Sequence, residues 1–171
     1  MQFHIDFISA RGAIFSKNLS RWVKFRFVAP ANYWKSETAF PVLLMNDGQD
    51  FGPMGIEQTL TKAFAKKTIR PFVYLGIECN EDRMQEYGIA SSADFKGRGS
   101  KAGHNSKFIL EEFIPFLKKE FKVSEKGEDW VYCGMSLGGL SAFDIAYNNP
   151  DKFGNIGVLS GSFWWRKQAY V

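Results

Sequence analysis

Residues 129–146 read DWVYCGMSLGGLSAFDIA and contain the pentapeptide GMSLG at positions 134–138. The apolar run before the pentapeptide is typical of a strand, and residues 137–148 have the spacing of a helix. A serine in a G-x-S-x-G turn between a strand and a helix is the arrangement of an activated nucleophile. Glycines on both sides remove side chains that would clash in so sharp a turn. The pattern predicts a nucleophilic Ser136, and the alternative is a small-residue turn that happens to hold a serine.

The preceding part of the chain predicts strands of two kinds. Residues 21–28, RWVKFRFV, alternate between apolar and polar side chains, which indicates a strand with one buried face, and residues 3–9 alternate more weakly. Continuous apolar runs in residues 41–45 and 70–78, and again in residues 156–160, are typical of strands covered on both faces. Two alternating strands therefore lead into a mostly parallel sheet.

Helical spacing fills the connections between these strands. Residues 55–67 have it, and so do residues 108–121, in which Pro115 predicts a kink or a local irregularity. Strands that alternate with helices indicate βαβ units and an α/β fold. The chain has 171 residues, of which 45% are hydrophobic and 23% charged. We therefore expect one α/β domain over residues 1–171 with its own core.

A second polar turn, NDGQD at residues 46–50, directly follows the apolar run of residues 41–45. In hydrolases with a G-x-S-x-G serine, one donor to the oxyanion is the N–H of the residue after the nucleophile. The other comes from the loop after an earlier strand. These two positions fall on the backbones of Leu137 and Gln49. The alternative is an ordinary Asp-Gly turn, because that dipeptide is common in turns.

Five segments of the chain are informative together, namely LLMNDGQDF (43–51), NEDRMQEYG (80–88), SKFILEEFIPFLKKEF (106–121), CGMSLGGLSAF (133–143) and NPDKFGNIGVLSGSFWW (149–165). In this order they resemble the "Putative esterase" branch of the α/β-hydrolase superfamily, which includes esterase D and enterochelin-esterase-like enzymes. The serine turn is shared by the whole superfamily, whereas the set and its order are more specific. The resemblance implies an α/β-hydrolase fold and a serine carboxyl-ester hydrolase, with Ser136 as nucleophile and the N–H groups of Gln49 and Leu137 as the oxyanion hole.

The residues that should assist the serine are missing from this sequence. In α/β-hydrolases the nucleophile is followed by an acid and then by a histidine, but no histidine follows Ser136. We therefore expect about six of the eight strands of such a sheet, with the histidine and the acid of the triad beyond the end of the chain. Asp144, on the helix after the nucleophile, and Asp151, in the turn after that helix, are poor substitutes. His104 is expected on the correct side of the sheet but not where the family has its histidine, and His4 is expected in the first strand.

A long polar segment, residues 79–103, exceeds an ordinary connection, and such loops are often functional. Arg83 and Glu86 match a family segment near the site, so they are expected to fix the loop as an ion pair or to be solvated charges. Trp164 follows the last strand on the side where open α/β sheets bind ligands, so it lines the substrate pocket or is ordinary packing. The glycines of residues 97–103 lack the spacing of nucleotide-binding loops, and no residues have metal-ligand spacing. Neither a cofactor nor a metal is expected.

Charge and cysteine content bound the partners. The net charge is +4 and the lysines are scattered, so no nucleic acid is expected. No apolar stretch approaches the ~20 residues that span a bilayer, so no membrane is expected, and the N-terminus has no signal-peptide pattern. Cys79 and Cys133 have no metal spacing, and Cys133 is expected to be a buried small hydrophobe. These features indicate a cytoplasmic protein, although a leader that had been removed would leave no trace in the sequence.

We therefore expect a serine carboxylesterase that acts on a small-molecule ester through an acyl-enzyme, with siderophore, feruloyl or acetyl carbohydrate and small thioester substrates all open. Because the base is missing, the 171-residue chain itself is expected to be nearly inactive. The alternative is a non-catalytic hydrolase-like module for binding or scaffolding. A sheet that stopped at the last strand would expose an apolar edge, so self-association is also expected.

Overall fold

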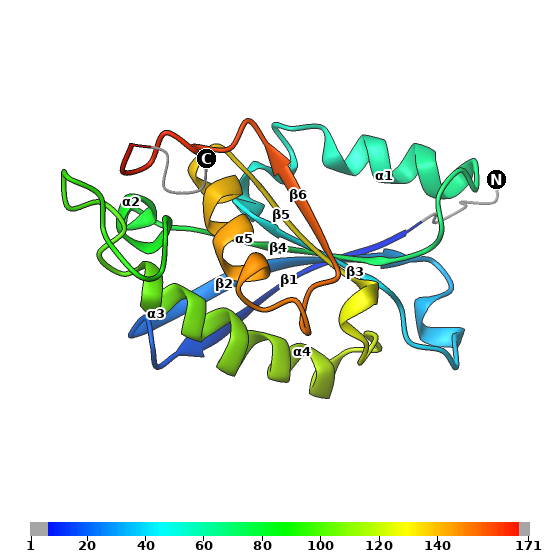
Figure 1. The fold of residues 1–171 in the computed structure, drawn as a ribbon. Coiled ribbons are helices and arrows are strands. Elements are labelled where there is room, and N and C mark those ends of the chain that lie inside the picture. Colours follow the sequence, from blue (N-terminus) through cyan, green and yellow to red (C-terminus); the bar gives the residue numbers. More distant parts are fainter. Residues whose placement is uncertain (1–6, 168–171) are drawn as a thin grey trace.

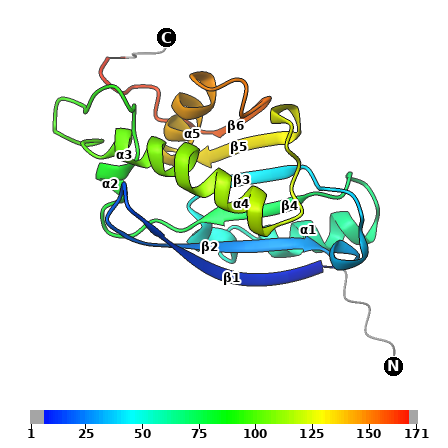
Figure 2. The same ribbon diagram turned by 90° about the horizontal axis from the view of Figure 1, so that it is seen from below.

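The computed structural model describes residues 7–167. Six strands form one sheet in the spatial order β1-β2-β4-β3-β5-β6, as Figure 2 shows. β2 is antiparallel to both of its neighbours, whereas β4, β3, β5 and β6 run parallel to one another. The expected α/β fold, with two N-terminal strands leading into a parallel sheet, is therefore confirmed. The strands are β1 (Phe7–Ser16), β2 (Arg21–Pro30), β3 (Val42–Asn46), β4 (Val73–Ile77), β5 (Trp130–Met135) and β6 (Asn155–Leu159).

Helices cover both faces of this sheet (Figures 1 and 2). α1 (Ile56–Ala65) lies on one face, and α3 (Ala102–Lys107), α4 (Ile114–Glu120) and α5 (Leu137–Tyr147) lie on the other. The one-turn α2 (Arg83–Glu86) belongs to the long segment 79–103, which gathers at the end of the sheet together with the chain after β6 (Figure 1). Short irregular helices are η1 (Tyr33–Lys35), η2 (Gly48–Phe51), η3 (Phe108–Phe113) and η4 (Gly127–Asp129).

The alternation in β2 is confirmed by burial. Val23, Phe25 and Phe27 are at most 4% exposed and belong to the core cluster beneath α4. The ring of Phe25 meets that of Phe113 edge-on, with centroids 5.4 Å apart. Aromatic pairs of this geometry stabilise a core beyond the area that they bury.

The first strand differs from the expected residues 3–9. Residues 3–6 lie outside the described part of the chain, and β1 continues to Ser16, paired with β2 along its whole length from Phe7↔Pro30 to Ser16↔Arg21. Gly12 in β1 lies against the ring of Phe25, and an added side chain there would come within 3 Å of that ring.

The expected irregularity before Pro115 is confirmed, but the helix begins earlier than residue 108. α3, η3 and α4 follow one another without a break, and η3 has the wider turn of a π-helix. Proline lacks an N–H and its ring collides with the preceding turn, so widening that turn relieves the collision. The wide turn buries Phe108, Ile109 and Phe113 together.

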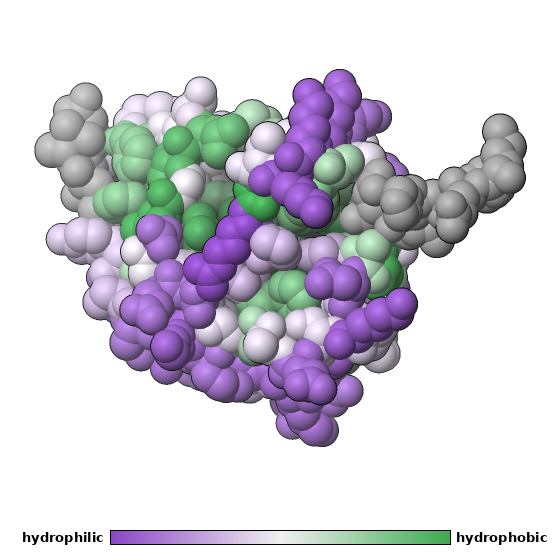
Figure 3. Space-filling view, turned by 90° about the vertical axis from the view of Figure 1, so that its right-hand side faces the viewer, coloured by the Kyte–Doolittle hydropathy of each residue, from purple (hydrophilic) through white to green (hydrophobic). Residues whose placement is uncertain are grey.

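The edge of the sheet at β6 is only partly covered. β6 has a neighbour on one side only among the described strands, and Ile156 and Leu159 in it are 37% and 47% exposed. The prediction of a strand covered on both faces is therefore wrong for β6, which in the described part of the chain lacks the second neighbour that would shield it. Figure 3 views the end of the molecule where the parallel strands begin and shows hydrophobic surface beside a band of hydrophilic side chains.

Within residues 7–167, no helix has the length and apolar character needed to cross a bilayer.

Candidate active site

Ser136 lies between β5 and α5 in a backbone conformation that residues other than glycine rarely adopt. Its φ is 54° and its ψ is −120°, a region that costs about 1–3 kcal/mol. A side chain at Gly134 would collide with the backbone of Gly138, and one at Gly138 would come within 2.5 Å of the carboxylate of Asp47. Close approach therefore requires both flanking glycines, and the turn leaves Ser136 exposed.

Backbone hydrogen bonds hold this turn from several directions. The N–H of Ser136 donates to the carbonyl of Leu159 at 2.9 Å, which links the turn to the end of β6. The carbonyl of Ser136 accepts the N–H of Leu140 in α5 and the N–H of Ser162 in the loop after β6, both at 3.1 Å. A strained conformation persists only where the surroundings over-determine it, and these bonds do so.

The two backbone N–H groups expected to stabilise an oxyanion lie in the first turns of two helices. Leu137 begins α5, and Gln49 lies in the first turn of η2. The side-chain amide of Asn46, the last residue of β3, donates to the carbonyl of Gly138 at 2.8 Å, so the end of β3 contacts the first turn of α5. Within residues 7–167, the N–H groups of Leu137 and Gln49 have no protein acceptor. Such helix-start donors are available to an external anionic oxygen.

The carboxylate of Asp47 ties this loop to segment 79–103. Arg83 donates to it twice, from Nε to Oδ1 at 2.7 Å and from Nη2 to Oδ2 at 2.8 Å. The thiol of Cys79 and the side-chain amide of Gln49 also donate to Oδ1, at 3.3 Å and 3.2 Å. Asp47 is 4% exposed and has a φ of 61°, a left-handed conformation that aspartate tolerates.

Asp47 and burial together set the protonation of this cluster. Hydrogen bonds to Asp47 raise the pKa of Arg83 above its usual value. Burial, followed by the charge of Asp47, raises the pKa of the Cys79 thiol to about 12 and that of the Tyr87 phenol well above its usual value. The phenol oxygen of Tyr87 accepts the N–H of Asp47 at 3.3 Å. At neutral pH the thiol and the phenol are therefore uncharged, and Arg83 balances Asp47.

Glu86 has a different partner from the one expected. It is 2% exposed and accepts two hydrogen bonds from Arg21 of β2, Nε to Oε1 at 2.7 Å and Nη2 to Oε2 at 2.6 Å. Because Arg83 is paired with Asp47, the ion pair considered between Arg83 and Glu86 is not formed, and the alternative of solvated charges is wrong for Glu86. Each side chain instead meets an opposite charge from another element. The two pairs attach segment 79–103 to the sheet and to the loop after β3.

Trp164 and its neighbour lie differently in the loop after β6. Trp165 is 1% exposed and fills the space beside Gly88 and Gly99 of segment 79–103. Trp164 is 56% exposed, and the guanidinium carbon of Arg98 lies 4.9 Å from the centre of its ring. Trp165 thus anchors the loop, while the ring of Trp164 lies against the guanidinium of Arg98, which is itself paired with the carboxylate of Asp94.

The remaining titratable residues do not complete a triad with Ser136. His104 is exposed on α3 and, within the described part of the chain, makes no hydrogen bond to Ser136. His4 lies outside the described residues. Asp144 is buried on α5, where its carboxylate accepts a backbone N–H of segment 79–103 at 2.7 Å, and Asp151 is exposed beside a lysine.

Sequence reasoning missed several residues that shape this site. Asp47 was visible only as part of an Asp-Gly turn, although an aspartate before glycine after a buried strand is a fair signal of a special backbone conformation. Arg21 binds Glu86, which is 65 residues away, and Arg98 contacts the ring of Trp164, which is 66 residues away. No local pattern in the sequence indicates such contacts. Ser162, whose hydroxyl oxygen lies 3.3 Å from that of Ser136, directly precedes Phe163 and Trp164, and no pattern around it indicates a role for its hydroxyl.

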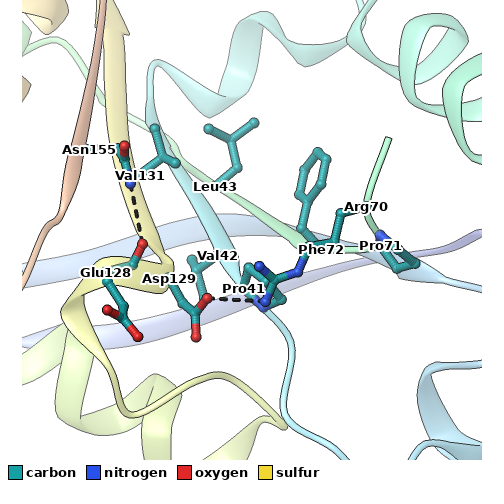
Figure 4. Close-up of a pocket in the computed structure, with 10 residues that line it drawn as sticks. All are labelled: Pro41, Val42, Leu43, Arg70, Pro71, Phe72, Glu128, Asp129, Val131 and Asn155. Carbon is teal, nitrogen blue, oxygen red and sulfur yellow. Dashed lines mark hydrogen bonds and ion pairs between the residues drawn. The ribbon is translucent and has the colours of Figure 1, made fainter. Parts of the chain in front are cut away.

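A separate hollow of about 310 Å³ lies at the opposite end of the sheet, where the parallel strands begin (Figure 4). Leu43, Phe72 and Val131 line it, and an ion pair of 3.1 Å between Arg70 and Asp129 borders it. Ligands of open α/β sheets bind at the other ends of the strands. This hollow therefore does not belong to the candidate active site.

Comparisons with known proteins agree on one family. A family model described as "Putative esterase" matches residues 16–170. The uncharacterized protein YbbA of Bacillus subtilis (strain 168) is 30% identical over 150 residues, which are 85% of this chain and 59% of YbbA. The iron(III) enterobactin esterase of Escherichia coli (strain K12) is 26% identical over 126 residues, which are 73% of this chain and 29% of that protein.

The fold agrees as well. The structure of the enterobactin esterase of Shigella flexneri in the presence of enterobactin matches with a TM-score of 0.78 at 21% identity, over 95% of this chain and 39% of that chain. At this identity the likeness establishes the α/β-hydrolase fold and no finer property. The chain spans 59% of YbbA and smaller shares of the two enterobactin esterases.

Proposed function

Because the chain belongs to the "Putative esterase" family, we propose that it carries the nucleophile and the oxyanion donors of a serine carboxylesterase. The conformation of Ser136 supports this proposal most directly. Its hydroxyl is exposed on a strained turn at the start of α5, where the helix dipole favours negative charge. A turn with no catalytic use gains nothing from that strain.

In the proposed reaction, Oγ of Ser136 attacks the carbonyl carbon of the ester. As the new C–O bond forms, the carbonyl π electrons move to its oxygen, where the N–H groups of Leu137 and Gln49 stabilise the charge. The proton of Ser136 passes to a base and then to the leaving alcohol as the ester C–O bond breaks. Water attacks the acyl-enzyme in the same way and releases the acid. Since no histidine follows Ser136 in the 171 residues, the base and its acid partner are proposed to come from outside this sequence.

Arg83, Glu86 and Trp164 have supporting parts in this proposal. Arg83 holds the loop of Gln49 through Asp47, and Glu86 holds α2 against β2 through Arg21. Trp164, exposed at the end of the sheet where the strands finish, is proposed to border the substrate pocket. Siderophore, feruloyl or acetyl carbohydrate and small thioester substrates all fit this chemistry.

Ester hydrolysis by the full-length gene product and by the 171-residue chain tests the proposal. We expect the full-length product to hydrolyse at least one of p-nitrophenyl acetate, a feruloyl ester, a catecholate siderophore ester or a small thioester. Ser136→Ala should lower that turnover by about 10³-fold or more. The matched variant Ser124→Ala, at a buried serine whose hydroxyl bonds Asp129, should keep it.

The 171-residue chain should show only the weak residual rate that an oxyanion hole and binding provide. Strong turnover by that chain, lost in Ser136→Ala, would contradict the missing base and point to His104. A folded full-length product that hydrolyses none of these esters would favour the non-catalytic binding or scaffolding module instead.

A further inference from the structure

A second hydroxyl, buried in the loop after β6, faces the proposed nucleophile. The Oγ atoms of Ser162 and Ser136 are 3.3 Å apart, and Ser162 is 3% exposed. Within residues 7–167, the hydroxyl of Ser162 has no other hydrogen-bond partner. Buried serines usually bond the backbone, as Ser16 does when its Oγ accepts the N–H of Leu19 at 3.0 Å. The hydroxyl of Ser162 is directed instead at Ser136.

The backbone of Ser162 is fixed on both sides. Its N–H donates to the carbonyl of Ser136 at 3.1 Å, and its carbonyl accepts the N–H of Trp165 at 3.1 Å. The buried ring of Trp165 lies so close to Gly88 and Gly99 that a side chain at either would come within 2.8 Å of it. The backbone of Ser162 is therefore held between the serine turn and an anchored tryptophan, and this places its buried hydroxyl beside that of Ser136.

We propose that Ser162 is a positioning residue of the esterase reaction, an inference that rests on the proposed function. Its O–H donates to Oγ of Ser136 while that oxygen attacks the ester carbon and its own proton passes to the base. The hydrogen bond keeps Oγ in one rotamer directed at the substrate and stabilises the charge that Oγ carries as the proton leaves. The same bond assists Oγ when it leaves the acyl carbon during hydrolysis of the acyl-enzyme.

Phosphonylation of Ser136 by a fluorophosphonate, followed on the full-length gene product, tests this role. The inactivation constant KI and the maximal rate constant kinact are measured for the parent and for Ser162→Thr, Ser162→Val and Ser162→Ala. Threonine and valine have the same shape, so their difference isolates the hydroxyl. Ser16→Ala is the matched control at a buried serine far along the chain.

We expect Ser162→Val and Ser162→Ala to lower kinact by about 10- to 100-fold, the range for one hydrogen bond to a charged atom. KI should stay within twofold, because the contact acts on the attacking atom. Ser162→Thr should keep kinact well above that of Ser162→Val at a similar melting temperature, and Ser16→Ala should react like the parent.

Equal kinact for the threonine and valine variants would overturn the role of Ser162 while leaving the proposed function intact. So would a loss confined to KI, which indicates a pocket residue. A folded parent that is not labelled at Ser136 would overturn the proposed function, and this inference with it.

Discussion

Asp47 combines a left-handed backbone with four side-chain hydrogen bonds to its carboxylate. The backbone turns the chain from β3 into η2, in whose first turn Gln49 lies, and the carboxylate holds that turn to Arg83 and Cys79 through hydrogen bonds. The close approach of Gly138 to the same carboxylate brings the serine turn into the arrangement. A single residue thus joins the proposed oxyanion loop, segment 79–103 and the start of α5.

The buried ion pair between Arg83 and Asp47 should contribute far more to the free energy of unfolding than an exposed ion pair does. In Arg83→Gln the carboxylate of Asp47, 4% exposed, loses both charge-assisted hydrogen bonds. We expect the free energy of unfolding in urea to fall by about 1–3 kcal/mol. Arg70→Gln, which removes the exposed pair with Asp129, should cost about 0–1 kcal/mol. Equal losses for the two variants would contradict the importance of the buried pair.

The raised pKa of Cys79 predicts a loss of stability in alkali. Burial and the charge of Asp47 raise the pKa of this thiol from 9.0 to about 12 in the folded chain. Above pH 9 the unfolded chain releases this proton while the folded chain keeps it, so the free energy of unfolding falls with rising pH up to about 12. Urea titrations from pH 8 to pH 11 should show a weaker decline in Cys79→Ala. Parallel declines would show that the thiol is not shifted.

At the scale of elements, the β5–α5 unit follows almost entirely from the sequence. The expected strand and helix agree with β5 and α5 to within about one residue at each end, because glycines, an apolar run and helical spacing act locally. The outcome for residues 102–120 shows the limit of such signals. A π-turn joins two short helices into one, and its register depends on packing against the sheet as much as on Pro115.

Charge pairing was not predictable for a related reason. Arg83 and Glu86 are close in sequence, and a local pattern pairs them with each other. Their partners, Asp47 and Arg21, lie 36 and 65 residues away and are brought near only by the order of the strands. The sequence could therefore indicate that segment 79–103 carries site residues, but not which charges hold it in place.

The serine turn should tolerate no side chain at Gly138. In Gly138→Ala the new methyl group would lie 2.5 Å from Oδ2 of Asp47 and 3.3 Å from Cβ of Asn46. We expect the free energy of unfolding to fall by about 1–3 kcal/mol. The melting temperature should then fall by about 2–4 °C for each kcal/mol. Gly52 has a right-handed helical backbone conformation and open space around it, so Gly52→Ala should leave the melting temperature unchanged or raise it slightly. A stable Gly138→Ala variant would contradict the close contact between α5 and the loop after β3.

At the scale of the whole molecule, the two ends of the sheet differ in character. Segment 79–103, η2 and the loop after β6 meet at the end where the parallel strands finish (Figure 1). The other end holds an apolar hollow with charged residues at its border (Figure 4). The proposed active site and the apolar hollow thus lie at opposite ends of the parallel strands, and variants at one of these two places should leave the other intact.

The open side of β6 predicts self-association of the 171-residue chain. Within residues 7–167 no strand pairs with the outer edge of β6, where Ile156 and Leu159 are exposed, and such an edge can pair with a second copy. We expect light scattering after size exclusion to show dimers or larger species, and Ile156→Lys to shift them toward monomer. Ile69→Lys, at a residue with the same 37% exposure away from the strands, should have no effect. A monomeric parent chain at high concentration would contradict this prediction.

Mass spectrometry of the full-length gene product after treatment with a fluorophosphonate tests the proposed nucleophile most directly. We predict one phosphonyl adduct on the peptide that contains Ser136, no adduct in Ser136→Ala, and unchanged labelling in Ser124→Ala. An adduct on another residue, or a folded protein that takes up no label, would contradict the assignment of Ser136.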